Sequence, residues 1–173
     1  MSLFRSLQNS PATVSIFHNA RIPLSNKLYN NLEKTYDTLP EKPKYEFTID
    51  LMKDKMPTYD QYRLFVDKCL TNEQAKVTLQ NCFPFLNDRQ THLYDTHGKT
   101  VTIKGIDWSN KIFSQSEYQM IYDTFNKLQE GNASIETTAS DVFKAPLIVD
   151  WDQNKLAGDE KTLELLLKVY KDQ

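Results

Sequence analysis

The sequence "KAPLIVDWDQNKLAGDE", residues 144–160, carries the pattern of a β-hairpin near the end of the chain. A run of apolar residues follows Pro146, and the polar residues 152–154 are typical of a tight turn. Residues 155–157 begin a return strand, and Gly158 and Asp159 then lead into "EKTLELLLKVY", a helical stretch at 160–170. The order proline, strand, turn, strand and helix predicts a hairpin with a covering helix.

The beginning of the chain predicts a strand, a helix and a second strand. Residues 13–17 form a β-branched strand, and "YEFTIDLM" at 45–52 alternates as a second strand does. Between them, Ser25 is expected to cap a helix that ends before Pro40. The apolar positions of this helix fall on one face: Leu28, Leu32, Tyr36 and Leu39. A β-α-β order favours two parallel strands with a right-handed crossover.

The middle of the chain is predicted to contain helices and a hairpin. Thr58 and Gln61 form a capping box, and the helix that follows has an apolar face made of Tyr62, Phe65, Val66 and Cys69. A shorter helix is expected at 72–81, and a longer one begins at Ser114 and Glu117 and ends at Gly131. Residues 93–108 are typical of a hairpin with its turn at 97–98, and residues 132–140 form a polar loop.

The composition excludes several classes of protein. The 173 residues suffice for one domain, and hydrophobic and charged residues make up 39% and 25% of the chain. A net charge of −2 gives no electrostatic reason to expect nucleic acid or an acidic membrane surface as partner. No apolar run approaches the roughly 20 residues that span a bilayer. Four glycines and the absence of a GxGxxG or GxxxxGK pattern argue against a phosphate-binding loop.

The first 12 residues resemble a short targeting signal. No acidic residue precedes Glu33, and "MSLFRSLQNS" contains serines, one arginine and three apolar residues on one helical side. This pattern is typical of a short mitochondrial presequence, and the alternative is a first helical turn or a frayed end. A single domain is expected to cover residues 13–173, with an insertion at about 85–140.

The two ends of the chain resemble the thioredoxin fold, which makes the expected fold class α/β. In that fold the proline before the third core strand is commonly cis and faces the loop after the first strand, and Pro146 matches this position. "IFHN" at 16–19 and "MPTYDQYRLF" at 56–65 also resemble the more distant arsenate-reductase branch. The loop of that branch carries a cysteine, and the corresponding position here lies at about Ile22.

One family resembles both ends more closely, namely the mitochondrial redox proteins of fungi, thioredoxin-like proteins that are often left as a domain of unknown function. The matching segments are "FHNARIPLS" at 17–25, "PTYDQ" at 57–61 and "FKAPLIVDWDQNKLAGDE" at 143–160. The last is the most specific because "VDW", a turn and a later Gly-Asp occur together. The resemblance covers roughly residues 10–70 and 141–170.

The resemblance implies an oxidoreductase that reduces small toxic molecules with a single cysteine. That cysteine is expected shortly before the "VDW" strand, but residues 131–146 contain none. The reaction would therefore fall to Cys69, with Cys82 as second choice. Both also fit a structural role, because buried cysteines behave as small hydrophobes and a helix C-terminus disfavours a thiolate. The two are too few for a disulfide scaffold, and a reducing compartment is the default.

Residues around the first strand form the expected substrate cleft. His18 could donate a hydrogen bond or a proton, or simply bond to backbone in a loop. Arg21 and Ser25 lie at a helix N-terminus, which attracts an anion such as the carboxylate of a glutathione-type thiol. Pro146 would complete the cleft, although Ser25 is equally explained as an ordinary helix cap.

Other polar residues give weaker indications. His92 and His97 have no third ligand nearby, so a metal site is not expected and no cofactor is required beyond an external thiol. Asp150 and Asp152 fit a solvated strand end better than an acid–base pair. Two hypotheses follow: a mitochondrial thiol oxidoreductase that acts on a small molecule, or a thioredoxin-like binding module that has lost catalysis.

Overall fold

The structure is a computed structural model that describes residues 10–87, 92–94, 100–102, 112–131 and 138–173. The chain divides into two units: the first comprises the residues up to Lys53 together with Ala145–Gln173, and the second comprises Asp54–Lys144. Each unit is described separately below. The second unit is wider than the insertion predicted at 85–140.

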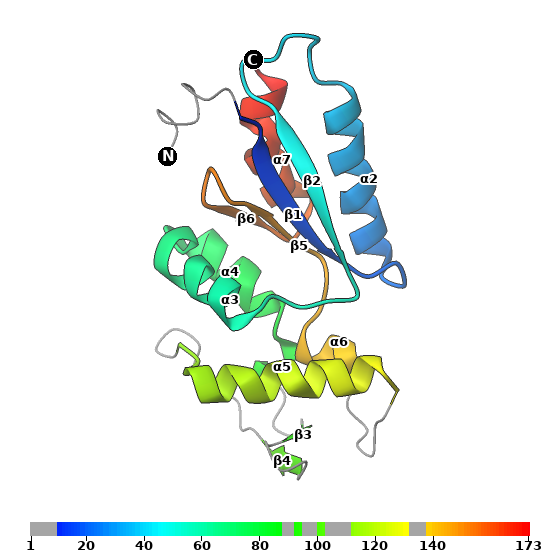
Figure 1. The fold of residues 1–173 in the computed structure, drawn as a ribbon, viewed down its shortest axis with the longest axis vertical. Coiled ribbons are helices and arrows are strands. Elements are labelled where there is room, and N and C mark those ends of the chain that lie inside the picture. The colour runs from blue at the N-terminus through cyan, green and yellow to red at the C-terminus, as the bar shows by residue number, and fades with distance from the viewer. Residues whose placement is uncertain (1–9, 88–91, 95–99, 103–111, 132–137) are drawn as a thin grey trace. The chain divides into compact units, whose positions relative to one another are not determined.

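The first unit is a four-stranded mixed sheet with two helices (Figure 1). Its elements are β1 (Ala12–His18), α2 (Pro23–Asp37), β2 (Phe47–Lys53), β5 (Leu147–Asp150), β6 (Lys155–Ala157) and α7 (Glu160–Lys171). The strand order is β2-β1-β5-β6, in which β1 and β2 are parallel and the other two pairs are antiparallel. The predicted α/β class, the parallel β-α-β start and the terminal hairpin with its helix are confirmed.

One face of this sheet forms the hydrophobic core with α2 and α7. Alternating residues of the strands supply one half of this core, and one stripe from each helix supplies the other half. The buried core residues are Ala12, Val14, Ile16, Leu28, Leu32, Phe47, Ile148, Ala157, Leu163, Leu166, Leu167 and Tyr170. The predicted apolar face of the first helix is therefore confirmed for Leu28 and Leu32, whereas the side chain of Tyr36 is 46% exposed.

The second unit is helical in most of its described residues. Its elements are α3 (Tyr59–Leu64), a π-helix (Phe65–Cys69), α4 (Glu73–Asn81), a 3-10 helix (Pro84–Asn87), β3 (His92–Tyr94), β4 (Thr100–Thr102), α5 (Gln115–Gln129) and α6 (Ala139–Val142). Both predicted capping boxes are present, at Thr58 and at Ser114. Gly131 follows α5 with a φ of 80°, a left-handed conformation that suits glycine and ends the helix.

A pair of short strands and an aromatic cluster complete this unit. β3 and β4 pair antiparallel with His92 opposite Thr102, as the hairpin prediction requires, and the turn predicted at 97–98 lies outside the described residues. The polar loop predicted at 132–140 is described only from residue 138 onwards, and there the prediction is wrong, because Thr138 is the N-cap of α6 and residues 139–140 are helical. The core is rich in buried aromatic residues: Tyr62, Phe83, Phe85, Phe113, Tyr118, Phe125 and Phe143. The Tyr62 and Tyr118 rings stack at 4.7 Å.

Candidate functional site

The segment that joins β1 to α2 is held by a buried histidine and a buried serine. The Nδ1 atom of His18 lies 2.6 Å from Oγ of Ser25, and the same hydroxyl accepts the N–H of Asn19 at 3.0 Å. The side chain of Ser25 is fully buried, and only 6% of His18 is exposed. The His18 ring also packs against Tyr29, with 5.0 Å between ring centroids. These contacts fix the course of the chain where β1 ends.

The prediction that Ser25 is the N-cap of the helix is wrong. The N-cap is Ile22, which has no side-chain cap, and Pro23 opens α2. Proline is favoured at the first helical position because it lacks the N–H that would be unsatisfied there. Ser25 lies within the first turn, and its hydroxyl bonds back to the preceding strand and loop instead of to the helix amides.

The N-terminus of α2 offers backbone donors for an anion. Within the described residues, the amides of Leu24 and Ser25 have no hydrogen-bond partner, whereas the amide of Asn26 bonds to Ile22 O at 3.2 Å. Arg21 is exposed immediately before this turn. Lys27 instead forms an exposed ion pair of 2.7 Å with Glu160. A small anion could therefore meet two amides and one guanidinium at this end of the helix.

Pro146 lies at the same end of the sheet as this loop. Leu147 is paired with Phe17 in the antiparallel register of β1 and β5, so the residue before it is adjacent to His18. The peptide bond between Ala145 and Pro146 is cis, as the resemblance to the thioredoxin fold implies. The structure thus brings together His18, Arg21, Ser25 and Pro146, the four predicted binding residues, within the first unit.

Both cysteines belong to the second unit and are buried. Cys69 is 2% exposed at the end of the π-helix, and Cys82 is 3% exposed just after α4. The Sγ of Cys82 donates to the carbonyl oxygen of Thr78 at 3.4 Å, and burial raises the pKa of its thiol to about 12. A thiol with this pKa is almost entirely protonated near neutral pH, which disfavours Cys82 as a nucleophile.

The interpretation of Asp150 as part of a solvated strand end is wrong, because its side chain is fully buried. Its carboxylate accepts the backbone N–H groups of Asp152 and Gln153, each at 3.0 Å, and the Gln153 side-chain amide at 2.6 Å. It also accepts the hydroxyl of Tyr170. The pKa of Tyr170 is raised, chiefly by burial and further by the adjacent carboxylate. The network joins the hairpin turn to α7.

A second network of side-chain hydrogen bonds crosses the sheet on the face opposite α2 and α7. The indole N–H of Trp151 donates to Ser15 Oγ at 2.8 Å, and this hydroxyl donates to Asp50 Oδ2 at 2.9 Å. The residues come from β5's end, β1 and β2, so they are far apart in sequence. Sequence reasoning missed both polar networks, because no local spacing relates their members.

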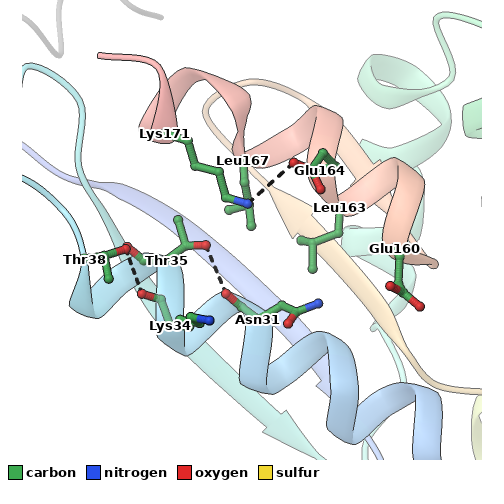
Figure 2. A pocket seen from close by; sticks show the side chains of 9 residues that line it. All are labelled: Asn31, Lys34, Thr35, Thr38, Glu160, Leu163, Glu164, Leu167 and Lys171. Atoms are coloured by element: carbon green, nitrogen blue, oxygen red, sulfur yellow. Dashed lines mark hydrogen bonds and ion pairs between the residues drawn. The ribbon is translucent and has the colours of Figure 1, made fainter.

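A shallow groove of about 290 Å³ lies between α2 and α7 (Figure 2). Its lining is mainly polar, with Lys34 and Lys171 opposed by Glu160 and Glu164. Lys171 Nζ lies 3.7 Å from Glu164 Oε1. Because these charges largely compensate one another, the groove has no preference for an anion or a cation.

Two further findings concern the part of the chain that the structure describes. No group of three or more His, Cys, Asp or Glu side chains within it could hold a metal ion. No helix within it is long and apolar enough to cross a membrane.

Comparison with known protein families shows to which family the chain belongs. The profile of a family described as a protein of unknown function, DUF1687, matches residues 4–159. The chain belongs to the DUF1687 family. The DUF1687 match includes the loop after β1, both cysteines and the "VDW" segment. No curated protein and no solved structure matches the chain in the corresponding comparisons.

Proposed function

We propose that this DUF1687 protein is a thioredoxin-like mitochondrial redox protein of fungal type that acts on small molecules through one thiol, Cys69. The observation that carries the proposal is the topology of the first unit. A parallel β-α-β start, together with a proline directly before β5 and an antiparallel hairpin that leads into α7, agrees with the features on which the resemblance to thioredoxin-like proteins rests, and so supports the proposal.

The proposed chemistry needs a single protein thiol. The Cys69 thiolate would attack an electrophilic sulfur of a small disulfide, forming a mixed disulfide and releasing the other half as a thiolate. An external thiol such as glutathione would then attack the substrate sulfur of the mixed disulfide, which restores the Cys69 thiolate and leaves the external thiol bonded to the substrate half. A second external thiol would release that half as a thiol and form the oxidised external disulfide. Cys69 is preferred because burial holds Cys82 protonated.

A second function is favoured by the burial of both thiols. If neither cysteine reacts in the folded protein, the first unit acts as a binding module. Its ligand would be a small anion held beside Pro146, the exposed Arg21 and the free amides of Leu24 and Ser25. This function requires no thiol, and the His18–Ser25 hydrogen bond supports it by fixing the loop before any ligand arrives.

Single-cysteine variants separate the two functions. In Cys82→Ala the remaining thiol is Cys69, and in Cys69→Ala it is Cys82. The rate of reaction with a chromogenic disulfide is measured for each variant against pH, in the folded protein and in urea. The redox proposal expects Cys69 to react in the folded state with a pKa below the ordinary value of about 8.5. If both thiols react only in urea, the redox proposal fails and the binding module stands.

The mitochondrial part of the proposal has an independent test. Residues 1–12, which contain no acidic residue, are fused to a fluorescent reporter and expressed in yeast. Import into mitochondria is expected, and a matched fusion with Arg5→Glu is expected to remain in the cytosol because presequences need a positive face. A cytosolic location of the unmodified fusion would contradict the proposed localisation.

A further inference from the structure

The outer edge of β2 is a regular strand edge with unused backbone groups. β2 runs unbroken along β1 from Phe47 to Lys53 and stands at the margin of the sheet (Figure 1). Ala12 N bonds to Glu46 O, so the even-numbered residues of β2 direct their backbone groups toward β1. The odd-numbered residues direct theirs outward.

These outward groups are available for pairing. In the described part of the chain, no hydrogen bond occupies the outward N–H and C=O groups of Ile49, Leu51 or Lys53. β2 contains neither a proline nor a bulge, two of the devices that blunt an exposed edge, and its charged residues are Asp50 and Lys53. A strand of seven residues with an open edge can accept a further strand.

The side chains of β2 define what such a strand would contain. On the face covered by the helices, Ile49 is half-buried and Leu51 is 42% exposed, so both present apolar surface at the edge. On the opposite face Asp50 is exposed, although one of its carboxylate oxygens accepts the hydroxyl of Ser15 at 2.9 Å. Glu46 lies directly before β2, four residues from Asp50, and is half-buried. An added strand therefore meets Ile49 and Leu51 on one face, with Lys53 at the end of β2, and the acidic Asp50 and Glu46 on the other.

We propose that the outer edge of β2 binds an extended segment of a partner protein in which basic and apolar residues alternate. The main chain of the segment pairs with the outward groups of β2. Its apolar side chains cover Ile49 and Leu51, and its basic side chains lie opposite Glu46 and Asp50. This alternation follows from the period of two in a strand. The site is independent of the proposed redox function.

A second copy of this chain fits the edge less well. If two β2 strands paired antiparallel about a two-fold axis at Asp50, the two Asp50 carboxylates would lie directly opposite each other. Moving the axis to Ile49 or Leu51 leaves Asp50 without a basic partner, because the face that carries Asp50 has Thr48 and Met52 as its neighbours on β2. Charge complementarity thus favours a basic partner over self-association.

The experiment uses a fluorescein-labelled, acetylated hexapeptide of alternating lysine and valine with the full chain. Fluorescence anisotropy is expected to show saturable binding, which the corresponding glutamate–valine peptide does not show. Leu51→Pro removes one outward N–H without breaking a bond to β1. It should weaken binding at least about tenfold relative to its matched control Leu51→Ala. Asp50→Asn should weaken binding about two- to fivefold.

Several results would overturn the proposal. These are no binding of the lysine–valine peptide, equal binding of the glutamate–valine peptide, or equal affinity of the Leu51→Pro and Leu51→Ala proteins. If Leu51→Pro fails to fold by circular dichroism, a backbone N-methylated peptide tests the same pairing with the unaltered protein and should not bind. A dimer of the protein alone that Leu51→Pro abolishes in sedimentation would assign the edge to a second copy instead.

Discussion

Replacement of Cys82 by alanine should change how the stability of the protein depends on pH. Burial raises the pKa of this thiol from 9.0 to about 12 in the folded state. In the unfolded chain the thiol is solvated and keeps its ordinary pKa. Between these two values the folded state holds more protons than the unfolded state, so the free energy of unfolding falls as the pH rises. Stability from the neutral thiol is complete below pH 9.0 and is lost as the pH rises toward 12.

The magnitude follows from these two values. At about pH 8 the unfolded thiol is mostly protonated, and the thiol contributes less than about 0.1 kcal/mol to the pH dependence. At about pH 10 the unfolded thiol is about nine-tenths ionised, whereas the folded thiol is about one-hundredth ionised. The wild-type protein should therefore lose about 1.4 kcal/mol more than Cys82→Ala between these conditions.

Urea unfolding of both proteins in the presence of a reducing agent measures this difference. Cys82→Ala also loses packing and is less stable at every pH, but this constant cost cancels when each protein is compared with itself. Burial also raises the pKa of Tyr62 to about 12, and the pKa of Tyr118 is raised as well. Both tyrosines are present in both proteins. Cys82 contributes to the raised pKa of Tyr118 only when its thiol is ionised, and at about pH 10 the folded thiol is almost entirely protonated, so the tyrosine contributions are nearly equal in the two proteins. Equal pH dependence of the two proteins would refute the burial of the Cys82 thiol.

Three further substitutions test the contacts that organise each unit, all by urea unfolding. Ser25→Ala removes the hydroxyl that bonds to buried His18 and to the amide of Asn19, and it should lower the free energy of unfolding by about 1–3 kcal/mol. An unchanged stability would contradict the stabilising role of these hydrogen bonds. Tyr170→Phe removes one donor to the buried carboxylate of Asp150 and should cost about 1.5–3 kcal/mol, and a smaller loss than about 0.5 kcal/mol would argue against a charge-assisted bond. Thr58→Ala removes the cap of α3 and should lower the free energy of unfolding by about 1 kcal/mol. The dependence of that free energy on urea concentration, the m value, should not change.

The elements that depend on local sequence could be predicted well. The capping boxes at Thr58 and Ser114 and the end of α5 at Gly131 depend on residues within a few positions of one another. The hairpin β5–β6 likewise follows from an apolar run, a polar turn and a return strand. Patterns of this kind are visible in the sequence because both interacting residues lie in the same short window.

Ser25 and Asp150 show where such reasoning fails. A serine near a helix start is usually a cap, but Pro23 begins the helix earlier and Ser25 turns toward His18. Asp150 belongs to a type of residue that is usually solvated, and its burial depends on Tyr170, which lies 20 residues away on α7. Both cases depend on packing between elements, which no local spacing encodes.

The candidate residues are divided between the two units, and this division bears on the choice between a redox function and a binding function. The first unit supplies the loop after β1, the free amides of α2 and Pro146, and the second supplies both thiols. Because Cys82 remains protonated near neutral pH, the redox proposal depends on Cys69 alone, and with no resolving cysteine it requires an external thiol for every turnover. Cys69 is 2% exposed, so it can react only as fast as the chain around it opens. The binding proposal carries neither requirement, and the reactivity of Cys69 in the folded protein therefore decides between the two.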